Sequence, residues 1–359
     1  MGFRGYFIRR IGVAFILLFV VMTLNYAIFF LMPGDPTSLF VNPRGPSDMA
    51  TKQLLIARLR AQWGLDKPPE IRFLIYIKNM LTWDFGNSIV TGQAVSTEMG
   101  QRLFYTLELM GGSTVLSILI GVALGVLVSY RRGGKFDSGV VTLSLITYSL
   151  PVFWMGLVLI LFFSVNLGWF PHANVMPFEW VEQGRMPIPY NVSSVGQSAQ
   201  WGGNVMLTVN PDNLVAYLSG YLTHLVLPLT TLTLFQYGGY VLLTRATMIE
   251  ALTEDYVVTA RAKGVQERNV IFRHALKNAS LPLITSAALA LGFMLSGAMI
   301  TEGVFSWPGL GRWIFDSVTT NDYHVLQAVF YIIAVCVIIA NIIADLLYGI
   351  IDPRIKYGA

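Results

Sequence analysis

Residues that could do catalytic or metal chemistry are few in this chain and lie far apart. Cys336 is the only cysteine, so neither an intrachain disulfide nor a cysteine-based metal site can form. The four histidines, at positions 172, 224, 274 and 324, have none of the spacings of metal ligands. The sequence has no serine–histidine pair suited to one membrane cavity and no phosphate-binding Gly-x-x-x-x-Gly-Lys-[Ser/Thr] loop. We therefore expect a chain that is not an enzyme and that carries neither a cofactor nor a metal.

The charged residues are scarce as well as scattered. Only 12% of residues are charged and 54% are apolar, whereas a soluble domain carries roughly 25% charged residues. Long blocks have no charge at all, which is typical of repeated passage through lipid. The net charge of +4 is too small to indicate a nucleic-acid partner. The composition predicts an all-α polytopic membrane protein.

Six apolar runs reach the length of about 20 residues that an α-helix needs to cross a bilayer. The first, Ile11 to Met32, is too long for the apolar part of a signal peptide, so we expect a retained helix within segment 1–34. Five further spans are expected near 109–130, 138–168, 222–243, 281–301 and 326–350, within a core of residues 103–359. Pro151 should kink the third span, and Gly121-x-x-x-Gly125 permits close packing of the second.

The positions of lysine and arginine predict the orientation. Basic residues collect at the amino terminus, in 131–135, in 245–277 and in the carboxyl-terminal tail. Two of the alternate loops hold only Arg185 across 169–221 and only Arg312 across 302–325. The third, 33–102, is richly charged, but long loops are exempt from the rule. Because short cytoplasmic loops carry the excess of basic residues, both termini are expected in the cytoplasm.

Two segments are expected outside the membrane on the opposite side. Residues 35–102 contain two sets of apolar residues at helical spacing: Leu55, Leu59 and Trp63 after a capping Ser47, and Ile71, Leu74 and Ile75 after Pro68-Pro69. They predict a small helical subdomain, which either lies on the lipid interface or helps to receive a delivery partner. Residues 169–221 read as an irregular loop, and its Trp169, Trp180 and Trp201 favour an interfacial belt over ligand contacts.

The most informative segment is the cytoplasmic loop 246–280. It is too polar to span, both halves are rich in helix formers, and Gly264 stands between them where a left-handed residue is wanted. In the second half Val270, Ile271, His274 and Ala275 share a face, which must be buried against something. Positive charge alone would fit a loop lying on lipid headgroups. The hinge glycine and the mixed charges of the first half favour a protein partner.

The loop resembles the coupling loop of inner-membrane subunits of binding-protein-dependent ABC importers, in the dipeptide/oligopeptide and nickel permease branch. That branch reads approximately D-Y-V-x-x-A-R-A-K-G, then R-H-A-L-x-N-x-x-x-P. The matching residues are Asp255, Tyr256, Val257, Ala260, Arg261, Ala262, Lys263, Gly264, Arg273, His274, Ala275, Leu276, Asn278 and Pro282. Further segments resemble the branch in the same order, at 64–68, 83–88, 102–109, 302–311 and 345–354. Two features depart from it: Trp83 stands where glycine is commoner, and 169–221 is longer than usual.

The resemblance implies a type I importer permease fold with six transmembrane helices, working by alternating access. It implies a homologous second permease, forming a heterodimer, two cytoplasmic ATPases that bind ATP and Mg²⁺, and an external substrate-binding protein. The implied substrates are dipeptides or oligopeptides, with oligosaccharides or nickel chelates as the alternatives. The residues expected to couple to the ATPase are Glu250, Asp255, Tyr256, Ala260, Arg261, Ala262, Lys263, Gly264, Val265, Arg273 and His274.

Three carboxylates could line the path or its vestibule: Glu108, Glu302 and Asp345. For Glu108 and Glu302, simple solvation at the outer interface is the stronger expectation. Asp345 lies near the cytoplasmic end of the last span, where it could pair with a basic group. An ion-coupled secondary transporter would place ionisable groups at the midplane, and the nearly uncharged spans argue against it.

Overall fold

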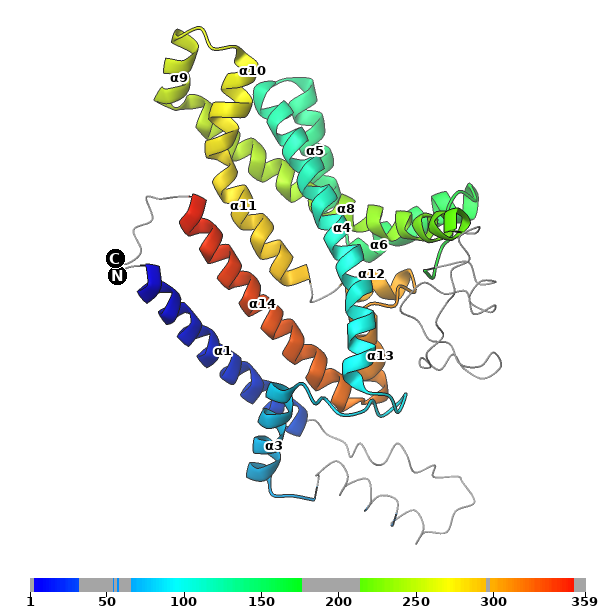
Figure 1. Ribbon diagram of the computed structural model, residues 1–359. Coiled ribbons are helices and arrows are strands. Elements are labelled where there is room, and N and C mark those ends of the chain that lie inside the picture. The colour runs from blue at the N-terminus through cyan, green and yellow to red at the C-terminus, as the bar shows by residue number, and fades with distance from the viewer. Residues whose placement is uncertain are drawn as a thin grey trace.

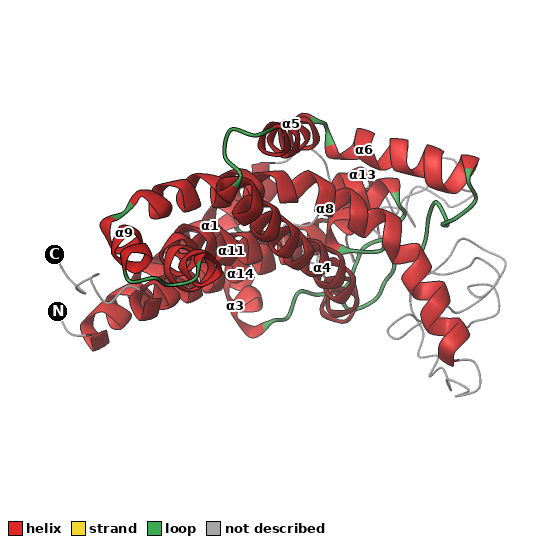
Figure 2. Ribbon diagram, turned by 90° about the horizontal axis from the view of Figure 1, so that it is seen from above, coloured by secondary structure: helices red, strands yellow, loops and turns green. Residues whose placement is uncertain are grey.

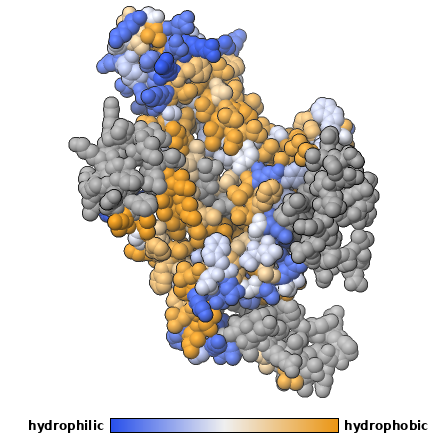
Figure 3. Space-filling view, in the orientation of Figure 1, coloured by the Kyte–Doolittle hydropathy of each residue, from blue (hydrophilic) through white to orange (hydrophobic). Residues whose placement is uncertain are grey.

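Long helices make up most of the chain that the computed structural model describes, namely residues 3–31, 54, 57, 66–175, 214–294 and 298–351. Four of them are long and apolar enough to cross a membrane: α1 (Phe3–Leu31), α4 (Val95–Tyr130), α8 (Leu214–Thr253) and α14 (Tyr323–Ile351). The middle of the visible face is hydrophobic, and the end that carries α9 is hydrophilic (Figure 3). The predicted helical, multi-pass architecture is confirmed at this level.

The third predicted span is broken and not merely kinked. It consists of α5 (Lys135–Ser149), followed by α6 (Val152–Leu159) and the π-helical η2 (Ile160–Asn166), with a bend of 103° between the two parts. Leu150 has an extended ψ of 139°, because proline disfavours a helical conformation in the residue before it, and Pro151 itself has a ψ of 129°. Figure 1 shows α6 turned away from α5, and Figure 2 shows both at one edge of the bundle.

The count of six spans remains a prediction. The described helices supply four spans, or five if the broken pair crosses once. The predicted span 281–301 corresponds to α11 (Leu276–Phe293) and the short α12 (Met299–Val304), and residues 295–297 between them lie outside the described part.

Two helices extend well beyond the apolar runs that predicted them. α4 begins at Val95, so the expected domain boundary at 102/103 falls inside one helix. α8 ends at Thr253, so it includes the first residues of the expected loop 246–280. Glu98 and Arg102 lie in the first turns of α4, buried and only 3.8 Å apart. Charged residues that pair inside the protein let a helix continue where hydropathy alone would end it.

Two glycines bring α4 and α8 together. A Cβ atom at Gly121 would lie 2.4 Å from Tyr240 Cβ, and one at Gly125 would lie 2.4 Å from Thr244 Cβ. No real carbon pair approaches so closely, so only glycine allows this packing. The close contact expected from Gly121-x-x-x-Gly125 is confirmed.

Gly125→Leu should therefore force α4 and α8 apart and destabilise the chain by about 3 kcal/mol or more. The measurement is the temperature at which a fluorescently tagged chain in detergent loses its monodisperse chromatographic peak. Gly12→Leu is the matched control, because no atom lies within 4 Å of a Cβ there. Equal loss in both variants would mean that the α4–α8 contact is not responsible.

At the end of the bundle opposite α9, α3 (Pro69–Thr82) and α13 (Leu310–Thr320) complete the described fold. Ile71, Leu74 and Ile75 share one side of α3 as expected, but α3 packs through another side, on which Tyr76 and Met80 are buried. The predicted helix after Ser47, with Leu55, Leu59 and Trp63, lies outside the described residues, as do Trp180 and Trp201. Trp169 is exposed and Cys336 packs against the main core cluster.

Candidate functional site: the helical hairpin around Gly264

The expected two-part loop is a compact helical hairpin. It consists of α9 (Asp255–Ala262), a turn at Gly264, α10 (Glu267–Asn269) and the π-helical η4 (Val270–Ala275); we call residues 255–275 the Gly264 hairpin. Gly264 has φ +76°, a left-handed value that glycine adopts without strain. Its N–H donates to Arg261 O at 2.9 Å, and Val265 N–H donates to Ala260 O at 3.2 Å. This pair of bonds is the Schellman ending of a helix, and the left-handed residue that the sequence predicted at Gly264 is part of it.

One face of the hairpin is buried against the ends of two membrane helices. Val257, Ala260, Val270, Ile271 and Ala275 pack in one cluster with Val126 of α4 and with Met248 and Ala251 of α8. The packing face expected for the second half is thus confirmed for its apolar members, while His274 is half-buried at the edge. A force applied to the hairpin is therefore transmitted directly to α4 and α8.

An ion pair closes the turn. Arg261 donates to the Glu267 carboxylate through Nη2 at 2.7 Å and through Nε at 3.2 Å. This bond lowers the pKa of Glu267 and raises that of Arg261. Both side chains are more than a third exposed, so the pair contributes at most about 1 kcal/mol. Its two hydrogen bonds fix the orientation of α9 relative to α10, and they contribute little to the stability of the fold.

Two known protein families match this chain. Residues 117–357 match the family described as binding-protein-dependent transport system inner membrane component, and residues 3–110 match the amino-terminal family of the same membrane components. The chain belongs to this family. It is accordingly a multi-pass inner-membrane protein of a transport system.

Relatives resemble this inner membrane component from end to end. The di/tripeptide transport system permease protein DppB of Pseudomonas aeruginosa is 36% identical over 349 residues, covering 97% of this chain and 98% of the relative. The dipeptide transport system permease protein DppB of Escherichia coli K12 is 35% identical over 355 residues, covering 98% of both. The oligopeptide transport system permease protein AppB of Bacillus subtilis is 36% identical over 354 residues, covering 98% and 99%.

Most residues expected to couple this membrane component to a partner lie on the accessible side of the hairpin or next to it. The exposed ones are Glu250, Asp255, Arg261, Ala262, Lys263, Gly264 and Arg273. Tyr256, Val265 and His274 are half-buried. Ala260 differs from them because it is buried in the cluster against α8, so its expected role in coupling, which stays a prediction, would act through packing.

Sequence reasoning missed two apolar side chains on the outer face of the hairpin. Val258 and Phe272 are 58% and 53% exposed, although they stand in a polar, cytoplasmic segment. A helical projection would have found them. Val257 and Ile271 occupy the buried face, so the residue that follows each must point about 100° away from it.

Glu302 does not line a vestibule and is not solvated at the interface, contrary to expectation. Its side chain is 0% exposed. Oε1 accepts a hydrogen bond from Thr106 Oγ1 at 2.9 Å, and Oε2 accepts one from Arg312 N–H at 2.9 Å. A Cβ at Gly309 would lie 2.4 Å from the carboxylate. Glu302 therefore satisfies backbone donors at the start of α13, where the helix dipole also favours a negative charge.

The other two carboxylates differ from Glu302. Glu108 is half-buried on α4, and its carboxylate accepts a hydrogen bond from the Tyr221 hydroxyl of α8. It therefore keeps exposed surface near the outer end of α4 and still qualifies as a vestibule residue. Asp345 lies in α14, and its side chain is outside the described part of the structure.

Proposed function

We propose that this chain is a permease subunit of an ATP-driven importer of short peptides, forming half of the path across the membrane. The observation that carries the proposal is the end-to-end likeness to relatives named for di/tripeptide, dipeptide and oligopeptide transport, each aligned over at least 97% of the chain. Likeness confined to the hairpin would support only the class of transporter. Likeness along the whole chain includes the helices that would enclose the substrate.

The Gly264 hairpin is the element proposed to dock on a cytoplasmic ATPase. Its buried face joins it to α4 and α8, and its outer face offers Val258 and Phe272 near the exposed basic residues Arg268 and Arg273. A movement of the hairpin would carry the two helices with it, as rigid-body alternating access requires. ATP binding would bias this equilibrium because it favours one state of the ATPase pair over the other.

The full assembly proposed is that of a type I importer. It contains a homologous second permease as heterodimer partner, two ATPases that bind ATP and Mg²⁺, and an external substrate-binding protein. This chain would contribute six spans with both termini in the cytoplasm, supported by the placement of its basic residues. Glu108 is the carboxylate proposed for the outer vestibule, because it combines exposed surface with a position beside Tyr221.

Purification of the tagged chain from its own membrane, followed by reconstitution into liposomes, tests the proposal. We expect ATPase chains and a second permease to co-purify, and a labelled dipeptide to be taken up only with ATP. Uptake confined to an oligosaccharide or a nickel chelate would overturn the peptide assignment. Uptake driven by an ion gradient, with no associated ATPase, would overturn the class of transporter.

A further inference from the structure

Helix α3 is held on the bundle by aromatic and polar contacts with α1. The Phe73 ring lies 6.4 Å from the ring of Phe19 and 5.2 Å from that of Tyr26. Tyr26 donates its hydroxyl to Pro69 O at 3.1 Å, and Asn25 Nδ2 donates to the Tyr76 hydroxyl at 3.0 Å. Figure 1 shows α3 set across the end of α1 and not in line with it. The position of α3 relative to α1 is thus firmly determined.

A second apolar surface of α3 faces away from these contacts. Ile71, Leu74, Lys78 and Leu81 follow one another at i, i+3 and i+4 spacing, so they form a single row. The three apolar members are 47%, 66% and 53% exposed, and we call this row the α3 stripe. Trp83, just beyond the helix, is exposed too. A water-facing helix would not carry three large apolar side chains in a row of four.

Three polar residues of α3 project together, with Ile75 among them. Arg72, Asn79 and Thr82 lie together on the helical projection, between the α3 stripe and the face that packs on α1. Lys78 lies in the stripe itself, and its long stem can reach from an apolar surface to water. On the other edge of the stripe, Glu70 of the first turn lies beside Leu74 and Leu81 in the projection. A helix with an apolar row bordered by polar residues suits the boundary between a protein bundle, lipid and water.

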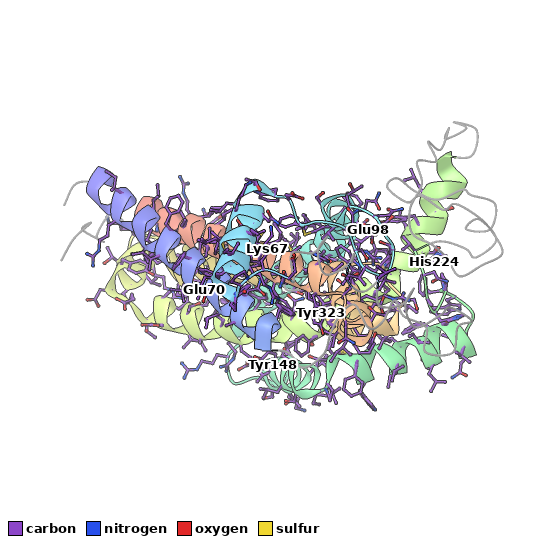
Figure 4. The ribbon with its side chains drawn as sticks, turned by 90° about the horizontal axis from the view of Figure 1, so that it is seen from below. Lys67, Glu70, Glu98, Tyr148, His224 and Tyr323 are labelled. Atoms are coloured by element: carbon purple, nitrogen blue, oxygen red, sulfur yellow. The ribbon has the colours of Figure 1, made fainter. Side chains whose placement is uncertain are left out.

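The depth of α3 is set by its contact with Phe19. Phe19 lies in the middle of the apolar part of α1, Ile8–Phe29, about ten residues or roughly 15 Å of helix rise from its end. Phe15, Ile16 and Phe19 are exposed side chains of the same helix, as expected of a lipid-facing surface. Since Phe73 contacts both Phe19 and Tyr26, α3 lies beside the outer half of the apolar part of α1. Lys67 and Glu70 mark where α3 begins, at its crossing with α1 (Figure 4).

We propose that α3 is an interfacial helix whose stripe, Ile71, Leu74 and Leu81, is embedded in the lipid leaflet on the side opposite the Gly264 hairpin. We assign the bilayer as its occupant because α3 packs against Phe19 of α1, on a helix whose Phe15 and Ile16 are also exposed. Trp83 stands at the end of the helix, and indole rings favour the headgroup level. The helix therefore anchors the bundle laterally.

Spin-label accessibility in the assembled complex, reconstituted in lipid nanodiscs, tests this placement. Cys336→Ala removes the only native thiol of this chain; Leu74→Cys and the matched control Asn79→Cys are then each labelled with a nitroxide on the purified chain before the complex is assembled. We expect the label at position 74 to collide several-fold more with dissolved oxygen than with a water-soluble nickel chelate. The label at position 79 should show the reverse preference. Equal access of the nickel reagent to both positions would overturn the proposal.

A second measurement needs no substitution. Lipids with a photoactivatable group on the acyl chain, incorporated around the unmodified complex, should label the peptide that contains residues 69–83. Absence of label there, while peptides of α1 are labelled, would contradict lipid burial. Protection of position 74 from the nickel chelate only after the substrate-binding protein is added would instead assign the stripe to that protein.

Discussion

Phe272→Asp is expected to abolish ATP-driven transport while leaving the chain folded and inserted in the membrane. The side chain is 53% exposed on the outer face of the Gly264 hairpin, so its loss leaves the buried cluster with α4 and α8 intact. An aromatic anchor at the centre of an interface commonly contributes about 2 kcal/mol, which weakens association roughly thirtyfold. An aspartate there adds an uncompensated charge to the interface. The measurements are the ATPase recovered with the tagged chain and the uptake of labelled peptide.

Asn269→Asp is the control for added charge, because residue 269 is exposed on the same hairpin. Phe272→Leu is the control for apolar contact and should retain much of the transport. If Phe272→Asp transports normally, the hairpin docks through another face or lies on lipid headgroups. Arg261→Glu would be less informative. It would set a second carboxylate against Glu267 and disturb the turn itself, so its failure would not separate docking from folding.

Gly309→Ala should have the largest effect on stability. The new methyl carbon would lie 2.4 Å from the buried carboxylate of Glu302, which accepts bonds from Thr106 and from the start of α13. Either the carboxylate loses its donors or the backbone moves, and an uncompensated buried charge costs about 3–5 kcal/mol. We expect a large fall in the temperature at which the tagged chain loses its monodisperse peak. The amount recovered in the membrane should fall as well.

Gly303→Ala serves as the matched control, because it adds the same methyl group on α12, one residue from Glu302, with no atom within 4 Å. Its stability should be close to that of the unmodified chain. If the Gly309→Ala chain is as stable as the control, the Glu302 carboxylate can move without destabilising the fold. Glu302 would then not be the cap of α13 that the contacts describe.

These two experiments address different ends of the molecule. The Gly264 hairpin offers an outer face to a partner and a buried face to α4 and α8, so it can pass a movement on. The Glu302 cluster joins α4, α12 and α13 through buried hydrogen bonds, so it holds its elements in one arrangement. A transporter that alternates between inward-facing and outward-facing states needs both properties, because its packed units rotate as rigid bodies only if the contacts within each unit are kept.

Several features followed from the sequence alone because their causes are local. Gly264 was expected at a left-handed turn, and it has one, because a positive φ depends on the residue itself. Gly121 and Gly125 were expected at a close helix contact, and Tyr240 and Thr244 lie against them. Apolar length predicted α1, α4, α8 and α14 as spans, since crossing a bilayer needs a fixed rise.

Other features depended on which distant residues meet. Glu302 was expected at a wet boundary, but Thr106, which is 196 residues away, and the start of α13 bury it. Ala260 was expected among the coupling residues, and the sequence did not show that it is buried in the cluster with the end of α8. Ile71 and Leu74 of α3 were left between the lipid interface and a delivery partner, and the contact of Phe73 with Phe19 is the basis on which we propose lipid. Sequence determines turns and spans because backbone preference and apolar length are local. The burial of a given side chain is decided by tertiary packing, since its neighbours come from distant parts of the chain.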